Sequence, residues 1–253
     1  MNKVIELKNI SFSYKKNQVF NDFSVDFYEK KISFLLGRNG SGKTTLLKLL
    51  NGFLEPDRGE VYLNGERLQT YSQQYISKII SYVPQNINAS NGFSVLDYLV
   101  LGRYPYIKYM FTAEDYSISK SMAVEMGVDN ILYKTLLELS GGEKQLISIT
   151  RALIQDTPII IMDEPMSALD LGNQAEVLNI IKKLQDRGKT VILTTHNPMH
   201  TFQIDSMVYL LHEGKIISQG STFDVINNEN IQKVYGDKVS YNESMQKIAF
   251  ELF

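Results

Sequence analysis

The sequence predicts an α/β fold in which helices cover a parallel sheet. Two compact apolar runs, 159–162 and 191–193, are typical of strands that are buried on both faces of such a sheet. Segments with apolar residues at helical spacing alternate with these runs, as they do in strand–helix–strand units. The predicted helices cover 43–51, 142–154 and 172–187.

Further strands are predicted towards both ends of the chain. Residues 4–14 and 19–27 alternate between apolar and polar, and 31–36 ends in a compact apolar stretch. The segment 206–220 is predicted to be a hairpin that turns at 213–214 and is followed by short helices.

The middle of the chain has a different pattern. From about 88 to 139 the sequence shows helical patterns and no good strand. Ser94 is predicted to cap a helix at 95–101, and Thr112 is predicted to cap a helix that runs through Met126. We therefore expect a helical insert within the α/β domain.

Composition excludes several kinds of chemistry. The chain has 253 residues and no cysteine, so disulfides, thiolate metal sites and cysteine nucleophiles are excluded. With 26 basic and 28 acidic residues, the net charge of −2 gives no footprint for nucleic acid. No apolar run approaches the roughly 18 residues of a membrane span, so a role at a membrane would need a partner.

Residues 37–44 fit the phosphate-loop pattern G-x-x-x-x-G-K-[ST], between an apolar strand and a helix. The glycines let backbone N–H groups turn towards phosphate oxygens, and the helix N-terminus adds partial positive charge. Lys43 is predicted to reach the β- and γ-phosphates of a bound nucleotide, and Thr44 to offer its hydroxyl to Mg²⁺. A chance glycine turn is the alternative, which this strand–turn–helix setting disfavours. The predicted nucleotide contacts here are Gly37, Arg38, Asn39, Gly40, Ser41, Gly42, Lys43, Thr44 and Thr45.

Two acidic residues follow the predicted strand 159–162. Asp163 can hold Mg²⁺ through water, and Glu164 is the candidate base that orients or deprotonates the attacking water. The alternative is a solvated strand end with two exposed acids. The presence of a phosphate loop in the same chain disfavours this alternative. Together these features define a P-loop NTPase, and the Asn-Lys-x-Asp tetrad that usually gives guanine specificity is absent.

Residues 139–145, L-S-G-G-E-K-Q, resemble the LSGGQ signature of ABC ATPases, with Glu at the variable last position. A serine before paired glycines at a helix start is itself an anion-binding arrangement. Other motifs of the family occur along the chain in the order typical of the family, and the resemblance spans about 4–236. They are Tyr14 as the adenine-stacking aromatic, Gln85 of the Q-loop, Asp170 of the D-loop S-A-L-D at 167–170, and His196 as the switch histidine.

Each of these residues has a simpler interpretation. Tyr14 is one of fifteen tyrosines and could pack on a sheet, and Gln85 could be an ordinary loop residue. Asp170 could be only the N-cap of the next helix, or it could serve in both roles. His196 and His200 have the i, i+4 spacing of a metal pair, but a strand end followed by a new helix puts them on different faces. The joint pattern outweighs these alternatives.

The resemblance implies a P-loop NTPase core with a RecA-like parallel sheet, an N-terminal antiparallel β subdomain and an inserted α-helical subdomain. It implies one domain over 1–253, with a catalytic core formed by 1–87 and 141–253 and an insert at 88–140 that carries the signature at its end.

The resemblance also implies a mechanism with ATP and Mg²⁺ as cofactors. Two copies, or this chain and a homologous ATPase subunit, would bind head to tail, so that ATP on Lys43 of one copy meets the signature of the other. Gln85 would contact Mg²⁺ and the attacking water, His196 would contact the γ-phosphate, and Asp170 would cross the dimer interface. The signature residues concerned are Ser140, Gly141 and Gly142.

Residues 99–106, L-V-L-G-R-Y-P-Y, resemble a stretch of importers for metal chelates such as iron siderophores, haem and cobalamin, although Tyr106 stands where His is common. This resemblance implies a membrane permease as partner, indirectly an extracytoplasmic binding protein, and a peripheral place on the cytoplasmic face of the cell membrane. A soluble ABC ATPase and an exporter subunit are the alternatives. Phe93, Leu96, Tyr104 and Tyr106 are candidates to line a docking groove for the permease, or they could pack the core of the insert.

Overall fold

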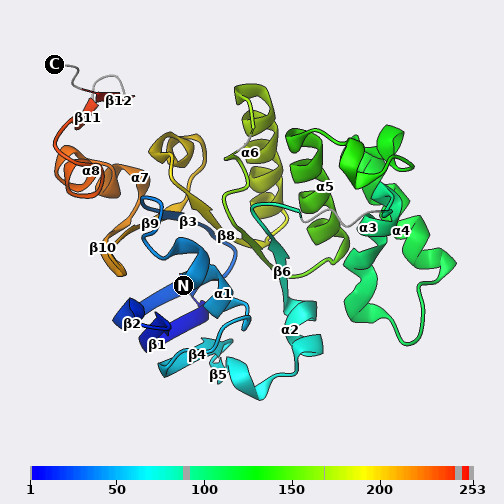
Figure 1. Ribbon diagram of the computed structural model, residues 1–253, viewed down its shortest axis with the longest axis horizontal. Coiled ribbons are helices and arrows are strands. Elements are labelled where there is room, and N and C mark those ends of the chain that lie inside the picture. The colour runs from blue at the N-terminus through cyan, green and yellow to red at the C-terminus, as the bar shows by residue number, and fades with distance from the viewer. Residues whose placement is uncertain (1, 88–91, 168, 243–246, 251–253) are drawn as a thin grey trace. The chain divides into compact units, whose positions relative to one another are not determined.

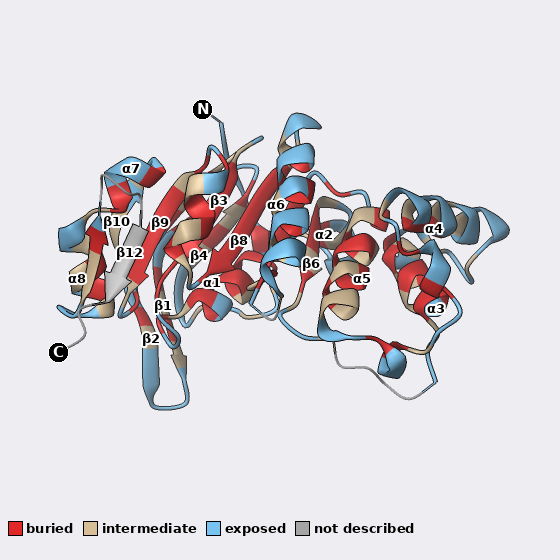
Figure 2. Cartoon of the chain, turned by 90° about the horizontal axis from the view of Figure 1, so that it is seen from above, coloured by how far each residue is buried: buried red, intermediate tan, exposed pale blue. Residues whose placement is uncertain are grey.

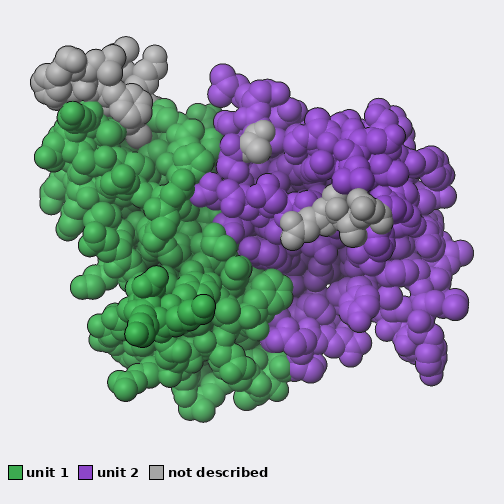
Figure 3. Space-filling view, viewed as in Figure 1, with its two compact units in different colours: residues 1–71, 181–253 green, residues 72–180 purple. Residues whose placement is uncertain are grey.

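The computed structural model describes residues 2–87, 92–167, 169–242 and 247–250. The chain divides into two compact units, which Figure 3 distinguishes by colour. Unit 1 comprises Met1–Tyr71 and Ile181–Phe253, and unit 2 comprises Ser72–Ile180. The predicted boundaries at 87/88 and 140/141 differ from this division and stay a prediction, and the first residues of the predicted insert, 88–91, lie outside the described residues.

Unit 1 contains an antiparallel sheet whose strands occur in the order β2-β1-β4-β5 (Figure 1). Alternate residues of β1 are buried, among them Ile5, Leu7 and Ile10, which explains the apolar–polar alternation of the sequence. The two strands predicted at 4–14 and 19–27 are confirmed. The bounds are β1 Lys3–Tyr14, β2 Asn17–Tyr28, β4 Arg58–Leu63 and β5 Glu66–Arg67.

The second sheet of unit 1 supplies the buried strands. Its order within the unit is β10-β9-β3-β8, where β3 runs parallel to both β8 and β9 and where β9 and β10 form the predicted hairpin. All residues of β3 and β8 are buried, as Figure 2 shows in red, so both strands consist almost wholly of apolar and small residues. The bounds are β3 Ile32–Leu36, β8 Thr190–Thr195, β9 Met207–His212 and β10 Lys215–Gly220.

The helices of unit 1 follow these strands. Helix α1 (Lys43–Leu50) begins directly after the phosphate loop, and its leucines at 46, 47, 49 and 50 are all buried. A 3₁₀ segment, η5, follows β8, and short elements close the unit. Their bounds are η5 Pro198–Gln203, α7 Thr222–Val225, α8 Asn228–Tyr235, β11 Val239–Asn242 and β12 Lys247–Phe250, with η1 Leu68–Thr70 after β5.

Unit 2 combines a parallel strand pair with helices. Strand β6 (Ile80–Val83) runs parallel to β7 (Ile159–Met162), and all four residues of β7 are buried. The helices are α2 Gln73–Ile79, α3 Val95–Val100, η2 Leu101–Tyr106, α4 Ala113–Glu125, η3 Asp129–Ile131, η4 Leu136–Glu138 and α5 Gly141–Ile154, and α6 Leu171–Asp186 continues into unit 1.

The helical insert has its own hydrophobic core, and its helix starts are set by the predicted caps. The hydroxyls of Ser94 and Thr112 accept N–H groups three residues later, and each sits in a capping box with an aspartate. Both predicted caps are confirmed. The core includes Val95, Leu99 and Leu96, and Leu96 is only 9 % exposed. Of the two alternatives for Leu96, the structure supports packing in the core of the insert and not the lining of a docking groove.

Several short elements were not predicted. Strands β4 and β6 have few residues and mix polar with apolar side chains, so the sequence shows too few repeats of the strand pattern to predict them. Within the described residues of the insert the only strand-like contact is one isolated bridge between Ser94 and Thr135. None of the described helices combines the length and the apolar character that a bilayer crossing needs.

Two glycines with the same backbone angle give a matched test of packing. Gly59 and Gly65 both have φ +83°, but a Cβ on Gly59 would lie 2.4 Å from the carbonyl oxygens of Lys8 and Asn9, whereas a Cβ on Gly65 would meet nothing within 4 Å. We expect Gly65→Ala to cost about 1 kcal/mol of unfolding free energy from backbone strain. Gly59→Ala should cost a further ~2 kcal/mol because β1 and β4 must separate. Urea unfolding measures both, and equal losses would contradict the close backbone approach.

Candidate functional site

The phosphate loop follows β3 and is shaped by its glycines. Gly37 is buried, and a Cβ there would lie 2.4 Å from the carbonyl oxygen of Leu211, so only glycine fits. Gly40 and Gly42 have φ values of +83° and +103°, which L side chains rarely adopt. The loop therefore turns as the sequence pattern requires and leads into α1 at Lys43.

Polar groups in this loop fit a bound anion. Lys43 is 6 % exposed, and its ammonium group donates to the carbonyl oxygens of Gly37 and Arg38 at 2.8 and 3.1 Å. The Ser41 hydroxyl is buried and has no hydrogen-bond partner among the described residues. Leaving a buried hydroxyl unpaired costs about 1–3 kcal/mol, which a phosphate oxygen would relieve. Thr44 is exposed at the start of α1, as a hydroxyl that reaches a metal ion must be.

His196 lies beside the phosphate loop because of strand register. In the parallel pair β3–β8, Leu36 is opposite Thr195, so Gly37 and His196 follow neighbouring strand ends. The His196 side chain is exposed. Tyr14, at the end of β1, is 44 % exposed and contacts a neighbouring phenylalanine ring edge to face, so its exposed ring can accept a stacking partner.

The turn after β8 is tied together by His200. Its Nδ1 lies 2.9 Å from Thr195 Oγ1, and its Nε2 lies 3.3 Å from Asn197 Nδ2. The ring is 7 % exposed. Burial and, as a smaller cause, the charge of the neighbouring His196 lower the pKa of His200 to about 4. Both ring nitrogens are thus engaged within the turn, which gives His200 a role other than the metal pair considered above.

In unit 2 the parallel strands β6 and β7 bring the amide residue Gln85 and the acidic residue Asp163 to neighbouring strand ends. Val83 of β6 is opposite Met162 of β7, so Gln85 and Asp163 follow neighbouring strand ends. The backbone N–H of Asp163 donates to the Val83 carbonyl at 2.8 Å, and the Asp163 side chain is only 2 % exposed. Gln85 is exposed.

Two further features distinguish this strand end. The Tyr82 hydroxyl donates to Asp163 Oδ2 at 3.4 Å, and burial together with the Asp163 charge raises the pKa of Tyr82. Glu164 has φ +45°, a left-handed conformation that is uncommon for a residue with a side chain and is found at functional turns. Its side chain is half-buried, so it remains accessible to water.

The signature motif forms the N-terminus of α5. The Ser140 hydroxyl accepts the Glu143 N–H at 3.2 Å, and the Glu143 carboxylate accepts the Ser140 N–H at 2.8 Å. These hydrogen bonds from the backbone and side chain of Ser140 hold the pKa of Glu143 below its usual range. The glutamate at the variable position of the motif therefore completes a capping box that fixes Ser140 at the helix start.

Asn173 links the signature to the segment before α6. Its backbone N–H and its side-chain amide donate to the two carboxylate oxygens of Asp170 at 2.9 and 3.0 Å. The same amide nitrogen would lie 3.2 Å from a Cβ on Gly142. A cavity of about 120 Å³ here is lined by Ser140, Leu169 and Asn173, among others. Asp170 thus caps the first turn of α6. Its role across a dimer stays a prediction, and Ala168 of the same motif lies outside the described residues.

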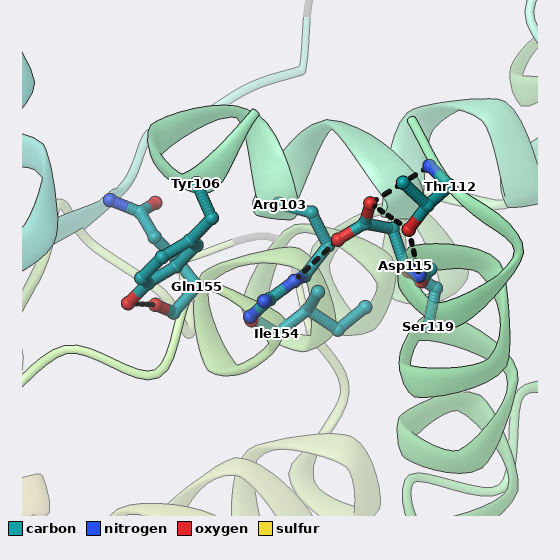
Figure 4. Close-up of polar contacts among 7 residues, drawn as sticks. All are labelled: Arg103, Tyr106, Thr112, Asp115, Ser119, Ile154 and Gln155. Atoms are coloured by element: carbon teal, nitrogen blue, oxygen red, sulfur yellow. Dashed lines mark hydrogen bonds and ion pairs between the residues drawn. The ribbon is translucent and has the colours of Figure 1, made fainter. Parts of the chain in front are cut away.

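The stretch that resembles metal-chelate importers holds the other end of α5 (Figure 4). The Tyr106 hydroxyl donates to the Gln155 carbonyl at 2.9 Å, and Arg103 Nη1 donates to the Ile154 carbonyl at 3.4 Å. Asp115 accepts from Arg103 Nε at 3.1 Å. The last carbonyl groups of the signature helix are therefore satisfied by η2 and by a cation at the favourable helix end.

The structure thus collects the predicted residues into groups, each within one unit. Unit 1 holds the phosphate loop, Tyr14 and His196, and unit 2 holds the Q-loop, the acidic strand end, the signature and the D-loop. Sequence reasoning missed the contributions of Tyr82 and Asn173. For Tyr82 the only sequence signal was its place in the strand before Gln85, and Asn173 lies three residues after Asp170, where a capped N–H is expected.

Comparison with known proteins shows which family model, relatives and solved structures the chain resembles. Residues 20–167 match the family model described as ABC transporter. An "Uncharacterized ABC transporter ATP-binding protein" of Haemophilus influenzae is 34 % identical over 92 % of this chain and 89 % of that protein. A "Probable iron chelatin transport ATP-binding protein" of Helicobacter pylori is 31 % identical over 92 % of both. A solved inward-facing structure named for a metal-chelate type ABC transporter has a TM-score of 0.83, 29 % identity, and covers 100 % of this chain and 98 % of its own.

The lowered pKa of His200 predicts a pH-dependent stability. Between pH 6.5 and about 4 the unfolded chain binds a proton on this imidazole that the folded chain does not, so stability falls as the pH is lowered. We expect a loss of about 2 kcal/mol from this residue between pH 7 and pH 5. Urea unfolding at both pH values gives the unfolding free energies of the parent and of His200→Asn. The difference between the two free energies should be smaller at pH 5 than at pH 7 by that amount. Equal pH slopes in the two proteins would contradict the burial of a neutral imidazole.

Proposed function

The chain belongs to the ABC transporter family as an ATP-hydrolysing transport enzyme, and from that premise we propose that it drives import of a metal chelate through a membrane permease. The cargo class is an iron siderophore, haem, cobalamin or a similar complex. The protein acts as a peripheral subunit on the cytoplasmic face of the cell membrane.

The observation that best supports the ATPase mechanism is that the phosphate loop is already shaped to bind an anion. Within the described part of the chain its buried Ser41 hydroxyl has no hydrogen-bond partner, and its left-handed glycines orient the backbone for an anion. Lys43 is held by carbonyl groups of the loop and needs only to exchange them for phosphate oxygens. These residues fit ATP. The Thr44 hydroxyl in unit 1 and the Asp163 carboxylate in unit 2 are each an oxygen ligand of the kind that Mg²⁺ prefers, and we assign both to that ion.

We assign the roles of the remaining residues from the resemblance to ABC ATPases, and their positions at strand ends support this assignment. Mg²⁺, when bound, neutralises charge that develops on the phosphate oxygens. Glu164 accepts the proton of the attacking water or orients that water, and Gln85 contacts the same water. His196 contacts the γ-phosphate from the neighbouring strand end.

A second copy completes the site. ATPases of this family pair as dimers with membrane permease components. We assign Ser140, Gly141 and Gly142 to the γ-phosphate of ATP bound by the partner copy, since the Ser140 hydroxyl is fixed at a helix N-terminus. Asp170 lies on the same interface. Each copy alone has an incomplete site, so hydrolysis requires the closed dimer.

The cargo class rests on relatives and on η2. The Helicobacter pylori relative is named for iron chelatin transport, and the solved relative is named for a metal-chelate type transporter. In η2, Tyr104 and Tyr106 are 71 % and 39 % exposed, and Phe93 before α3 is 40 % exposed. We assign these three aromatic side chains to the surface that contacts the permease. The alternative function, a soluble or exporter-type ABC ATPase, would use the same ATP site with another partner.

Two substitutions separate binding from hydrolysis. Glu164→Gln should leave ATP affinity unchanged and slow hydrolysis by at least ~10³-fold, because the amide cannot accept the proton of the attacking water. Lys43→Ala should weaken ATP binding itself, because it removes the charge that faces the phosphates. Equilibrium nucleotide binding and steady-state phosphate release measure the two effects. Hydrolysis at the parental rate in Glu164→Gln would remove this residue from the role of base.

The transport partner can be captured with the same variant. Glu164→Gln, tagged and loaded with ATP in its native cell, should co-purify from gently solubilised membranes with a polytopic permease and an extracytoplasmic binding protein. Adding Tyr104→Ala should reduce that recovery, whereas adding Tyr133→Ala, at a residue that is 78 % exposed, should not. Recovery of ribosomal or other soluble partners without a permease would overturn the transport function and leave the ATPase site intact.

A further inference from the structure

His200 and Tyr235 support the turn that carries His196 from two sides. We propose that both are positioning residues for His196, which fix the backbone from which its imidazole reaches the γ-phosphate of ATP. This inference rests on the hydrolytic role proposed above for His196. His200 acts from within the turn, and Tyr235 acts from α8, so the C-terminal helices take part in shaping the nucleotide site.

The inner support is a closed set of hydrogen bonds. Asn197 Oδ1 accepts the Met199 N–H at 3.0 Å, which turns the amide nitrogen of Asn197 towards His200 Nε2. His200 Nε2 must therefore accept, and the ring proton lies on Nδ1, which donates to Thr195 Oγ1 at 2.9 Å. Thr195 Oγ1 also accepts the Asn197 N–H at 3.1 Å. The residues immediately before and after His196 are thus locked to the same imidazole.

The outer support comes from the C-terminal elements of unit 1. The Tyr235 hydroxyl, at the end of α8, donates to the carbonyl oxygen of His196 itself at 3.2 Å. The next turn is held in the same way, because Thr222 Oγ1 donates to the Thr201 carbonyl at 2.8 Å. The Phe202 ring stacks on Tyr241 with centroids 5.7 Å apart and planes inclined by 20°.

These contacts act on the backbone and leave the His196 side chain exposed. Because a misplacement of about 1 Å can cost ~10²-fold in rate, a turn fixed on both sides of His196 matters for catalysis. A purely structural role for His200 makes a different prediction. A buried imidazole that only filled space would be replaced without loss by an apolar side chain of similar volume.

The test compares variants of the full-length chain in ATP binding and in turnover. His200→Leu and Tyr235→Phe should lower kcat by ~10-fold, from a partial misplacement of His196, with the ATP dissociation constant unchanged. His200→Asn keeps an amide N–H where Nδ1–H donates to Thr195, so it should recover most of the activity. Tyr209→Phe is the control. It loses a tyrosine–carbonyl hydrogen bond of the same kind, to Asp26 at 2.7 Å, but away from the turn, and should keep the parental kcat.

A spectroscopic readout separates position from stability. The chain has three histidines, so ¹³C labelling at the histidine Cε1 gives three signals. In folded Tyr235→Phe without nucleotide, the His196 signal should shift or broaden, whereas Tyr209→Phe should leave it unchanged. Because the Tyr235 hydroxyl lies in a partly exposed contact, this variant keeps the test open if His200→Leu fails to fold.

The outcomes distinguish the hydrolytic role of His196 from the positioning roles of His200 and Tyr235. If His196→Ala hydrolyses ATP at the parental rate, the role of His196 is wrong and the positioning role falls with it. If His196→Ala loses hydrolysis but His200→Leu and Tyr235→Phe both keep the parental kcat and an unchanged His196 signal, only the positioning inference is overturned. Reduced kcat in both variants, with rescue by His200→Asn, supports it.

Discussion

Parallel pairing of buried strands is the constraint on which both parts of the site depend. Strands that are buried on both faces cannot carry polar side chains along their length without a cost, so the polar groups come where the strands end. Strands β3 and β8 end in register at Leu36 and Thr195, and β6 and β7 end in register at Val83 and Met162. Within each pair, residues that are far apart in sequence are thereby brought to neighbouring strand ends.

Several functional groups are held in place by hydrogen bonds that involve the backbone. Lys43 is held by carbonyl groups of its own loop, Ser140 by a capping box, and Asp163 by its backbone bond to the neighbouring strand. Preorganisation of this kind lowers the cost of ordering side chains when ATP arrives. It also places strain where it is useful, as in the left-handed conformation of Glu164.

The sequence predicts those parts of the fold and the candidate site that depend on local pattern. The phosphate loop, the caps Ser94 and Thr112 and the buried strands each follow from neighbours along the chain. The support from Tyr82 and Tyr235 does not, because these residues reach partners 81 and 39 positions away in the sequence. Helical periodicity also could not tell that Leu96 faces the core of the insert, since an apolar residue suits either a core or a docking surface.

The central claim is that ATP is held between the phosphate loop of one copy and the signature of a second, and cross-linking tests it most directly. The chain has no native cysteine, so Asn39→Cys in one copy and Gly141→Cys in another, both with Glu164→Gln, supply the only thiols. A Cβ on Gly141 would meet nothing within 4 Å. We expect ATP to promote a disulfide between the two different variants, and neither variant alone to form one. A disulfide between two Asn39→Cys copies, or none between the different variants with ATP, would contradict the head-to-tail site.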